Sequence, residues 1–325
     1  MTPFERALRE RIAAEGAISV EAYMEACNTY YYATRDPLGA RGDFTTAPEI
    51  SQMFGELVGA ALADCWAKAG CPADAIYVEL GPGRGTLAAD ALRVLRSAGF
   101  AGEVHLVETS PILRDLQGKA VPEAHWHDSI ETLPPRPLLL VANEFLDALP
   151  VRQFVSTQER HVVVAGGGLA FDRDGEIVES SPARDAVVDT ISAHLARHGG
   201  VALMVDYGHE RSAPGDTVQA VRGHAFAPIL ASPGEHDLTA HVDFEAVAQA
   251  ATSAGAMTTA VATQRDWLNR LGIGARAAAL TNANPERADE LATAVQRLTG
   301  RDAMGELFKV IAVHARDWSE PAGFA

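Results

Sequence analysis

Residues 76–87 read IYVELGPGRGTL, and this stretch decides the fold of the chain. An apolar strand carries Glu79 near its end, and the turn that follows contains Gly81, Gly83 and Gly85. Glycine permits positive φ angles and lets a ligand approach the backbone closely. The next residues, TLAADALRVLRSAG, have helical spacing, so free N–H groups at the start of this helix would face the ligand. The pattern predicts a strand, turn and helix that bind a nucleotide-bearing cofactor.

A second predicted strand, residues 103–107, ends at Glu108, whose carboxylate can accept hydrogen bonds from both hydroxyls of a ribose. Rossmann dinucleotide enzymes share both features, but their fingerprint is G-x-G-x-x-G, and here Thr86 stands at the third glycine position. Glu79 would repel a pyrophosphate and would suit the ammonium of an amino-acid moiety. S-adenosylmethionine, which has such an ammonium, is therefore favoured over a dinucleotide as the cofactor.

Composition limits the class of protein. Of the 325 residues, 47% are hydrophobic, which is ample for the core of one large or two modest domains. The formal net charge of −16 argues against a nucleic-acid partner, because phosphate binding needs clustered Lys and Arg. The N-terminus lacks an apolar signal segment, and no uncharged apolar run reaches transmembrane length. We therefore expect a cytoplasmic protein with no integral membrane segment.

The cysteines do not indicate a metal centre. Cys27, Cys65 and Cys71 lack the spacing of metal ligands and leave an odd thiol. We expect buried, reduced side chains and no bound metal.

Strand and helix patterns alternate along the chain and indicate an α/β fold with a mostly parallel sheet. We predict seven strands in this sheet, near residues 75–80, 103–108, 124–126, 138–143, 201–205, 256–262 and 307–314. The last strand, LFKVIAVHA, is almost wholly apolar, as expected for an antiparallel strand that is covered on both faces near the edge of the sheet.

The chain divides into an N-terminal region and a core. Residues 1–72 are predicted to form helices and a loop that covers the cofactor, and residues 73–325 the cofactor-binding core. Insertions into the core are expected at about 151–180, 209–242 and 264–300. The first has the short strands and glycine turns of a small antiparallel sheet, the second is polar and irregular, and the third is helical.

Polar residues stand at the ends of four predicted strands. In open parallel sheets, ligands bind beyond the carboxyl ends of the strands, where the strand order reverses. A single acid at such a place is commonly a helix cap, but four polar ends on one rim favour a shared site. The ends are Glu79 with the glycine turn, Glu108 with Thr109, Asn143 with Glu144 and Asp147, and Asp206 with Tyr207 and Gly208.

Residues 138–154, LLLVANEFLDALPVRQF, are the second strong signal. An apolar strand delivers Asn143 and Glu144 to the edge of the sheet where a methyl acceptor would lie. Glu144 or Asp147 would orient an acceptor nitrogen, remove its proton or bind a guanidinium through a bidentate pair. Asn143, Glu144 and Asp147 are therefore the candidate catalytic residues.

The cofactor contacts are predicted on four segments. The polar loop 42–52 is interpreted as a cover over the cofactor. Asp128 and Ser129 follow the short third strand, where an acidic side chain would accept a hydrogen bond from the adenine amino group. The candidate cofactor-binding residues are Thr45, Thr46, Pro48, Gln52, Glu79, Gly81, Pro82, Gly83, Gly85, Glu108, Thr109, Asp128, Ser129 and Asn143.

Eight segments resemble the MidA-like family, which includes a mitochondrial complex I assembly factor that is a protein arginine methyltransferase. These segments are GDFTTAPEISQMFGELVG, ELGPGRGTLAADALR, HLVETSPILRDLQ, NEFLDALPVRQF, VDYGH, GDTVQAVRGHAF, HDLTAHVDF and MGELFKVIA, and the resemblance extends from about residue 4 to residue 313. The resemblance implies a class I S-adenosylmethionine-dependent methyltransferase fold, Rossmann-like with seven strands. It also implies dimethylation of an arginine in a NuoD-type subunit of respiratory complex I, which would support complex I assembly.

By position, the resemblance implies that the three glycines line the cofactor loop, that Glu108 binds the ribose, and that Asn143 and Glu144 lie at the transfer site. The chain departs from the family pattern at Ala47, where a serine is expected. The segment after Phe154 is also shorter than expected and lacks a tryptophan before Glu159, which leaves the substrate in question. Three alternatives stay open: a cofactor-binding assembly chaperone without essential catalysis, a methyltransferase for another substrate, and an NAD-dependent enzyme. The oligomeric state is also open.

Overall fold

The computed structural model describes residues 1–34, 45–223 and 225–324. Its central sheet has seven strands in the order β16-β18-β11-β5-β2-β3-β4, and two short strands pair beside this path, β15 with β11 and β17 with β18. The strands are β2 (Ile76–Leu80), β3 (Val104–Val107), β4 (His125–His127), β5 (Leu138–Asn143), β11 (Gly200–His209), β15 (Val242–Asp243), β16 (Met257–Thr258), β17 (Ala262–Thr263) and β18 (Phe308–His314).

The directions of these strands confirm the predicted fold class. Strands β4, β3, β2, β5 and β11 run parallel, and β18 runs antiparallel between β11 and β16. The predicted strand 256–262 is divided into β16 and β17, because Thr259 lies between them and hydrogen-bonds Ala312 through its side chain as well as its backbone. The carboxyl ends of β2, β3 and β5 meet at one edge of the sheet, which is where the site forms.

Helices cover both faces of the sheet, because side chains alternate across it along each strand. Tyr77 of β2 points into the core with α4 (Gln52–Lys68) and α5 (Thr86–Ser97). Its neighbours Ile76 and Val78 point into the other core, with α7 (Pro182–His198) and α8 (Phe244–Ser253). The short helices α3 (Ala47–Ile50) and α6 (Pro111–Ala120) lie near the same edge as the strand ends.

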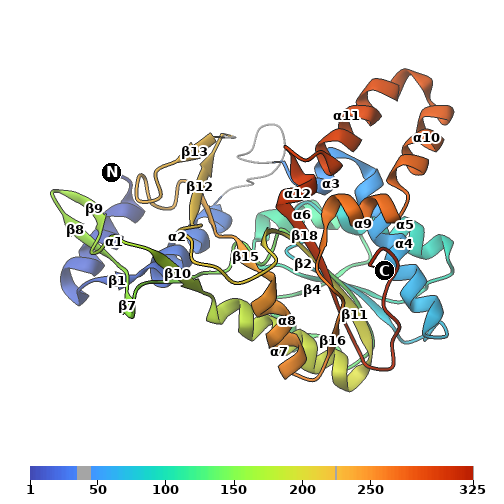
Figure 1. Ribbon diagram of the computed structural model, residues 1–325, viewed down its shortest axis with the longest axis horizontal. Helices are drawn as coiled ribbons and strands as arrows, with labels where there is room; N and C mark the ends of the chain where they lie inside the picture. Colours follow the sequence, from blue (N-terminus) through green and yellow to red (C-terminus); the bar gives the residue numbers. More distant parts are fainter. Residues whose placement is uncertain (35–44, 224, 325) are drawn as a thin grey trace.

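The N-terminal helices pack with two of the insertions in a separate lobe, on the left in Figure 1. Its core brings Leu8 and Met24 of the helices against Val162 and Leu238. The elements of this lobe are α1 (Pro3–Glu15), β1 (Ile18–Ser19), α2 (Val20–Thr34), β6 (Arg152–Val155), β7 (Gln158–Glu159), β8 (His161–Ala165), β9 (Gly168–Phe171), β10 (Ile177–Ser180), β12 (Gln219–Arg222), β13 (Ala225–Ala227) and β14 (Asp237–Thr239). In contrast, α3 and α4, which the sequence analysis grouped with the N-terminal helices, pack on α5 and the sheet.

Two segments differ from the sequence expectations. Residues 209–242, expected to be irregular, contain the small sheet β13-β12-β14. Strands of three or four residues, with one buried residue in β12, none in β13 and three in β14, are too short to produce a recognisable alternation. Cys27 and Cys65 are buried as expected, whereas Cys71 is exposed.

Four helices lie between β17 and β18, in and just after the segment predicted as a helical insertion at about 264–300. They are α9 (Gln264–Arg270), α10 (Ile273–Ala283), α11 (Ala288–Thr299) and α12 (Met304–Leu307), with a 3₁₀ turn at Pro285–Arg287; a second 3₁₀ turn, Ile130–Thr132, follows β4. The α10–α11 hairpin projects from the body at the upper right of Figure 1. Arg276 of α10 anchors it by a bidentate ion pair with the buried Glu56 of α4, at 2.6 and 2.7 Å. In the described part of the chain, every helix is too short or too polar to cross a membrane.

Candidate functional site

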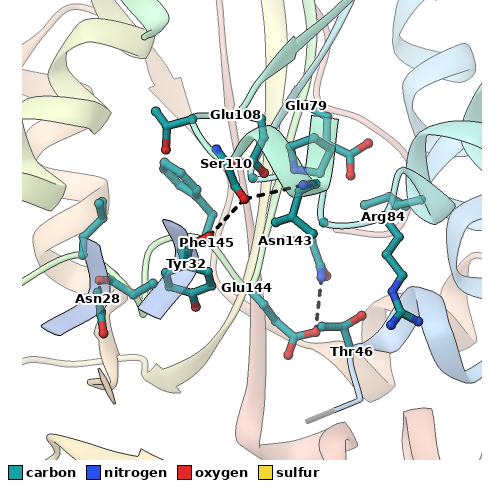
Figure 2. Close-up of a pocket in the computed structure, with 18 of the residues that line it drawn as sticks. Asn28, Tyr32, Thr46, Glu79, Arg84, Glu108, Ser110, Asn143, Glu144 and Phe145 are labelled. Atoms are coloured by element: carbon teal, nitrogen blue, oxygen red, sulfur yellow. Dashed lines mark hydrogen bonds between the residues drawn. The ribbon is translucent and has the colours of Figure 1, made fainter. Parts of the chain in front are cut away.

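A cavity of about 490 Å³ opens at the carboxyl ends of β2, β3 and β5. Figure 2 shows that its walls come from distant parts of the chain: Asn28 and Tyr32 of α2 lie on one side and Arg84 of the glycine turn on the other. A second hollow of about 340 Å³ contains Asp128 and Ser129. The two hollows share Gly81, Glu108, Thr109 and Phe145, so they adjoin at the ends of β2 and β3.

The glycine turn has the left-handed backbone that its composition predicts. Gly81, Gly83 and Gly85 have φ angles of +58°, +53° and +81°. A Cβ atom at Gly81 would lie 2.9 Å from Cδ2 of Phe145, so this position has no room for a side chain. Gly81, Pro82 and Gly83 line the large cavity. Gly85 lines neither hollow, because it is the N-cap of α5 and faces Gln117 and Ala120 of α6.

Glu79 places a buried carboxyl group beneath this turn. The residue is 2% exposed, and Tyr77 donates a hydrogen bond of 2.7 Å to its Oε2. Burial raises the pKa of Glu79 to about 8, although the Tyr77 hydroxyl opposes this shift. A cationic group bound in the cavity would therefore stabilise the ionised form of Glu79.

Glu108 lies where the two hollows adjoin. Its Oε1 accepts a hydrogen bond of 2.8 Å from the Ser110 backbone N–H, and Gln117 donates to its Oε2 at 3.3 Å. Burial raises the pKa of Glu108, and these donors oppose the rise. Arg114 joins the ends of β3 and β4 by donating to the carbonyl of Glu108 at 2.7 Å and to Asp128 Oδ1 at 2.6 Å.

Asn143 and Glu144 form the third strand end. The φ angle of Glu144 is +50°, which is strained for a residue with a side chain, and its backbone N–H donates to the carbonyl of Val205 at 2.9 Å. Its Oε1 accepts hydrogen bonds from Asn143 Nδ2 at 3.2 Å and from the Ala47 backbone N–H at 3.1 Å. Burial and the nearby Asp147 raise the pKa of Glu144 to about 8. Buried Asn143 Oδ1 has no hydrogen-bond partner among the described residues and remains available to an N–H group of a ligand.

Asp147 does not reach either hollow, although the sequence placed it with Glu144 as a catalytic candidate. It is buried behind the turn, and its backbone N–H and that of Leu146 both donate to Asp206 Oδ2, at 3.2 and 3.0 Å. After the turn that begins at Glu144, only Glu144 of these two acids lines the large cavity, and Asp147 lines neither hollow. Asp206, the fourth predicted strand end, supports this turn by accepting these two backbone hydrogen bonds, and it lines neither hollow.

Arg184 of α7 is a second support that the sequence analysis missed. This buried guanidinium donates to the backbone carbonyls of Leu146 (2.6 Å), Asp147 (3.4 Å), Ala240 (2.8 Å) and His241 (2.7 Å). It thereby joins the turn after β5 to the segment that leads into α8, and it lies near the carboxylates of Asp147 and Asp206. An arginine in a helix of mixed polarity gives no sequence signal for such a role.

Replacement of Arg184 by methionine is expected to reduce the free energy of unfolding by about 3–5 kcal/mol, because four carbonyls and two buried carboxylates lose their cation. Urea unfolding measures this change. The matched control is Arg197→Met on the exposed face of the same helix, for which a change below about 0.5 kcal/mol is expected. Equal stability of the two variants would contradict the supporting role of Arg184.

The covering segment is described only from Thr45 onward, so Asp43 and Phe44 of the predicted loop lie outside the described residues. Thr46 and Pro48 line the large cavity, as does Glu49, which the sequence analysis did not select. Thr45 lines neither hollow. Gln52 also lies away from them and donates to Glu56 at 3.0 Å.

One wall of the cavity comes from α2, which the sequence analysis placed outside the site. Glu25, Thr29 and Tyr32 face the cavity because residues three and four apart share one face of a helix. The Tyr32 hydroxyl donates to Asp237 at 2.7 Å, and the Tyr32 carbonyl accepts from the Ser110 hydroxyl at 2.9 Å. The run of three tyrosines at the end of α2 was the available signal, but the partners of Tyr32, Ser110 and Asp237, are distant in sequence.

Comparison with known proteins gives this site its class. Residues 57–168 and 164–263 match the model of the S-adenosyl-L-methionine-dependent methyltransferase family. The chain belongs to this methyltransferase family. A crystal structure of a COG1565 superfamily member from Burkholderia thailandensis, bound to S-adenosyl-homocysteine, is 30% identical, superimposes with a TM-score of 0.86, and is matched over 98% of this chain and 93% of that chain.

Curated relatives are similar over nearly the full chain. Protein arginine methyltransferase NDUFAF7, mitochondrial, from Danio rerio is 34% identical over 94% of this chain and 85% of its own length. The Homo sapiens protein of the same name is 31% identical over 96% of this chain and 83% of its own length. These names point to the mitochondrion and correct our expectation of a cytoplasmic protein. An apolar signal segment directs secretion, so a search for one does not distinguish the cytoplasm from the mitochondrion.

The cofactor of this methyltransferase is S-adenosyl-L-methionine, and the cavity fits it. Gly81 leaves space where a side chain would stand, Asn143 Oδ1 has no partner in the part of the chain that the structure describes, and Glu79 presents a carboxyl group that a cation would ionise. We propose that these residues hold the amino-acid part of the cofactor. For the nucleoside we propose Glu108 at the ribose and Asp128 with Ser129 in the adjoining hollow.

The raised pKa of Glu79 predicts proton release on ligand binding. At pH 7 the free protein holds this proton, since the pKa is about 8, and the ammonium of S-adenosylhomocysteine favours the carboxylate. Calorimetry at pH 7 in phosphate and in Tris should show release of about 0.5–1 proton per ligand. The Glu79→Gln variant should release fewer, and an equal release from both proteins would contradict the assignment.

The same shift determines how Glu79 affects stability. The unfolded chain loses this proton near pH 4.5, whereas the folded protein keeps it up to about pH 8. The folded state therefore binds more protons in this window, and the contribution of Glu79 to stability falls as the pH rises through it.

Proposed function

We propose that this methyltransferase is a protein arginine N-methyltransferase that acts on a NuoD-type subunit of respiratory complex I and supports assembly of the complex. The names of the curated relatives support the acceptor class. The observation that carries the proposal within this chain is the Glu144 carboxyl group. It lines the cavity beside Asn143 Oδ1, which accepts no hydrogen bond from residues 1–34, 45–223 or 225–324.

These two groups suit a guanidinium acceptor. The pKa of a free guanidinium exceeds about 12, so an arginine enters the site with its proton and needs a base as the new bond forms. The Glu144 carboxylate would bind the cation and accept that proton, and Asn143 Oδ1, which has a second lone pair beside the one used by the cofactor, would orient an N–H group of the acceptor. S-adenosylmethionine supplies an electrophilic methyl group on a sulfonium. Alignment of the acceptor nitrogen by these residues would supply several kcal/mol of the rate enhancement.

The α2 wall supports a macromolecular acceptor. Glu25 and Thr29 line the cavity and are also exposed, so the cavity is open to solvent along α2. A side chain on the surface of a protein can enter from this side, and Glu25 adds a negative charge near the entrance that favours a cation.

Co-expression with a NuoD-type subunit tests the proposal. The wild-type enzyme should increase the intact mass of the subunit by one or two methyl groups, and peptide fragmentation should locate them on an arginine. An unmodified subunit, with S-adenosylhomocysteine binding intact, would reject this acceptor. Restored complex I assembly without any mass increase would instead favour the chaperone function.

A further inference from the structure

The segment 46–50 contacts two parts of the cavity: the glycine turn proposed to hold the cofactor, and Glu144 at the proposed transfer site. It forms the single helical turn α3, in which the Thr46 carbonyl accepts from the backbone N–H groups of Glu49 at 3.0 Å and Ile50 at 3.2 Å. Ala47 and Pro48 within it are buried. These internal hydrogen bonds and the proline make the turn a compact unit whose residues move together.

Glu49 connects this unit to the glycine turn. Its Oε1 accepts a hydrogen bond of 2.6 Å from the Thr86 hydroxyl, and its Oε2 lies 3.9 Å from Nη1 of Arg84. Arg84 belongs to the glycine turn, and Thr86 is the first residue of α5 directly after it. The carboxylate therefore contacts the cofactor loop on both sides of Gly85.

Ala47 connects the same unit to the transfer site. Its backbone N–H donates the 3.1 Å hydrogen bond to Glu144 Oε1. Only one residue separates Ala47 from Glu49, so a shift of Glu49 displaces the N–H group that Glu144 uses. Figure 2 shows Glu144 directed toward Thr46, at the start of this segment.

We propose that Glu49 is a positioning residue that fixes the glycine turn and the Glu144 carboxylate to one rigid segment, so that both halves of the site keep one geometry. The proposal rests on the proposed function for the role of Glu144. Loss of the Glu49 contact with Thr86 would loosen the cofactor loop and withdraw the Ala47 N–H from Glu144. A single substitution outside the transfer site would then weaken cofactor binding and change the titration of Glu144.

The electrostatic surroundings of Glu144 determine the direction of that change. Asp147 on the same turn, Asp206 of β11 and Asp237 of β14 all disfavour its ionised form. The N–H of Ala47 and the side chain of Asn143 favour it. Withdrawal of the Ala47 N–H therefore raises the pKa of Glu144 further above about 8.

Two pairs of variants test the proposal. Glu49→Ala removes the carboxylate, and Glu49→Gln keeps an oxygen that accepts from Thr86. Thr86→Val removes the hydroxyl with little change of shape, and Thr86→Ser restores it. We expect Glu49→Ala to bind S-adenosylhomocysteine about tenfold more weakly than wild type, and Thr86→Val about fivefold more weakly. The rescue variants, Glu49→Gln and Thr86→Ser, should bind it within about twofold of wild type.

Glu144 is followed directly by ¹³C NMR of glutamate carboxyl groups, assigned with Glu144→Gln. The titration midpoint should rise in Glu49→Ala and Thr86→Val and return in the rescue variants. In the methylation assay Glu49→Ala should lower kcat about tenfold and leave the KM for the acceptor within about twofold, because the α2 wall is unchanged. A general structural defect would leave the titration midpoint of Glu144 unchanged. It would also not be reversed by both Glu49→Gln and Thr86→Ser.

Folded Glu49→Ala and Thr86→Val proteins with wild-type affinity and an unchanged Glu144 midpoint would overturn the proposal. If wild type binds the ligand but leaves the NuoD-type subunit unmodified, the acceptor assignment fails instead. The affinity and titration measurements still decide the role of Glu49 in that case, because neither requires turnover.

Discussion

The Gly81→Val variant should fold but fail to bind S-adenosylhomocysteine. Valine strongly disfavours a φ of +58°, and its Cβ would lie 2.9 Å from Cδ2 of Phe145. Either the glycine turn or Phe145 must shift, and both line the two hollows. Calorimetry should show a loss of affinity of roughly a hundredfold or more, equivalent to about 3 kcal/mol.

The control for backbone strain is Gly99→Val. Gly99 has a φ of +95° and no atom within 4 Å of an added Cβ, and it follows α5 at the end remote from the glycine turn. Both variants should lose about 1–3 kcal/mol of stability from the strained backbone. Only Gly81→Val should lose affinity, and equal affinities of the two variants would show that the turn does not hold the cofactor.

The Glu144→Gln variant should keep its affinity for S-adenosylhomocysteine and lose about 10²–10⁴-fold in kcat. The amide retains the size of the side chain and an oxygen for the Ala47 N–H, but it cannot accept the proton of a guanidinium. Because burial and Asp147 raise the pKa of Glu144 to about 8, the wild-type value of kcat/KM should rise with pH to a midpoint near 8. This rise should be absent in the variant. Initial rates from intact-mass measurements of the acceptor subunit report both effects.

Glu10→Gln is the control for the change in net charge, because Glu10 is exposed on α1 and lies outside both hollows. It should retain the rate and the pH dependence of wild type. Methylation by Glu144→Gln at the wild-type rate would remove Glu144 from the reaction, whereas loss of ligand affinity in this variant would assign it to cofactor binding.

The fold could be predicted because its signals are local. The glycine turn after β2, the apolar strands and the mostly apolar β18 are properties of short segments, and each defines one element of the sheet. The strand ends Glu79, Glu108 and Asn143 follow from the same reasoning, since parallel strands present their carboxyl ends on one edge. These three residues do line the large cavity.

The sequence prediction and the structure differ where side-chain direction depends on a turn or on distant packing. Asp147 follows Glu144 by three residues but lines neither hollow; it is buried, and its backbone N–H and carbonyl bind Asp206 and Arg184. Gly85 satisfies the glycine pattern but packs on α6. Neither result has a signature in a short window of sequence.

By itself, the sequence determined the α/β class, the strand–turn–helix at residues 76–87 and the polar strand ends, because these depend on residue type and periodicity. Only the tertiary structure decided that α2 forms a wall of the cavity, that Arg184 supports the turn after β5, and that Glu49 reaches Thr86. Those contacts join segments tens of residues or more apart in the chain. Their geometry follows from how the lobe and the helices pack on the sheet, and local pattern carries no information about it.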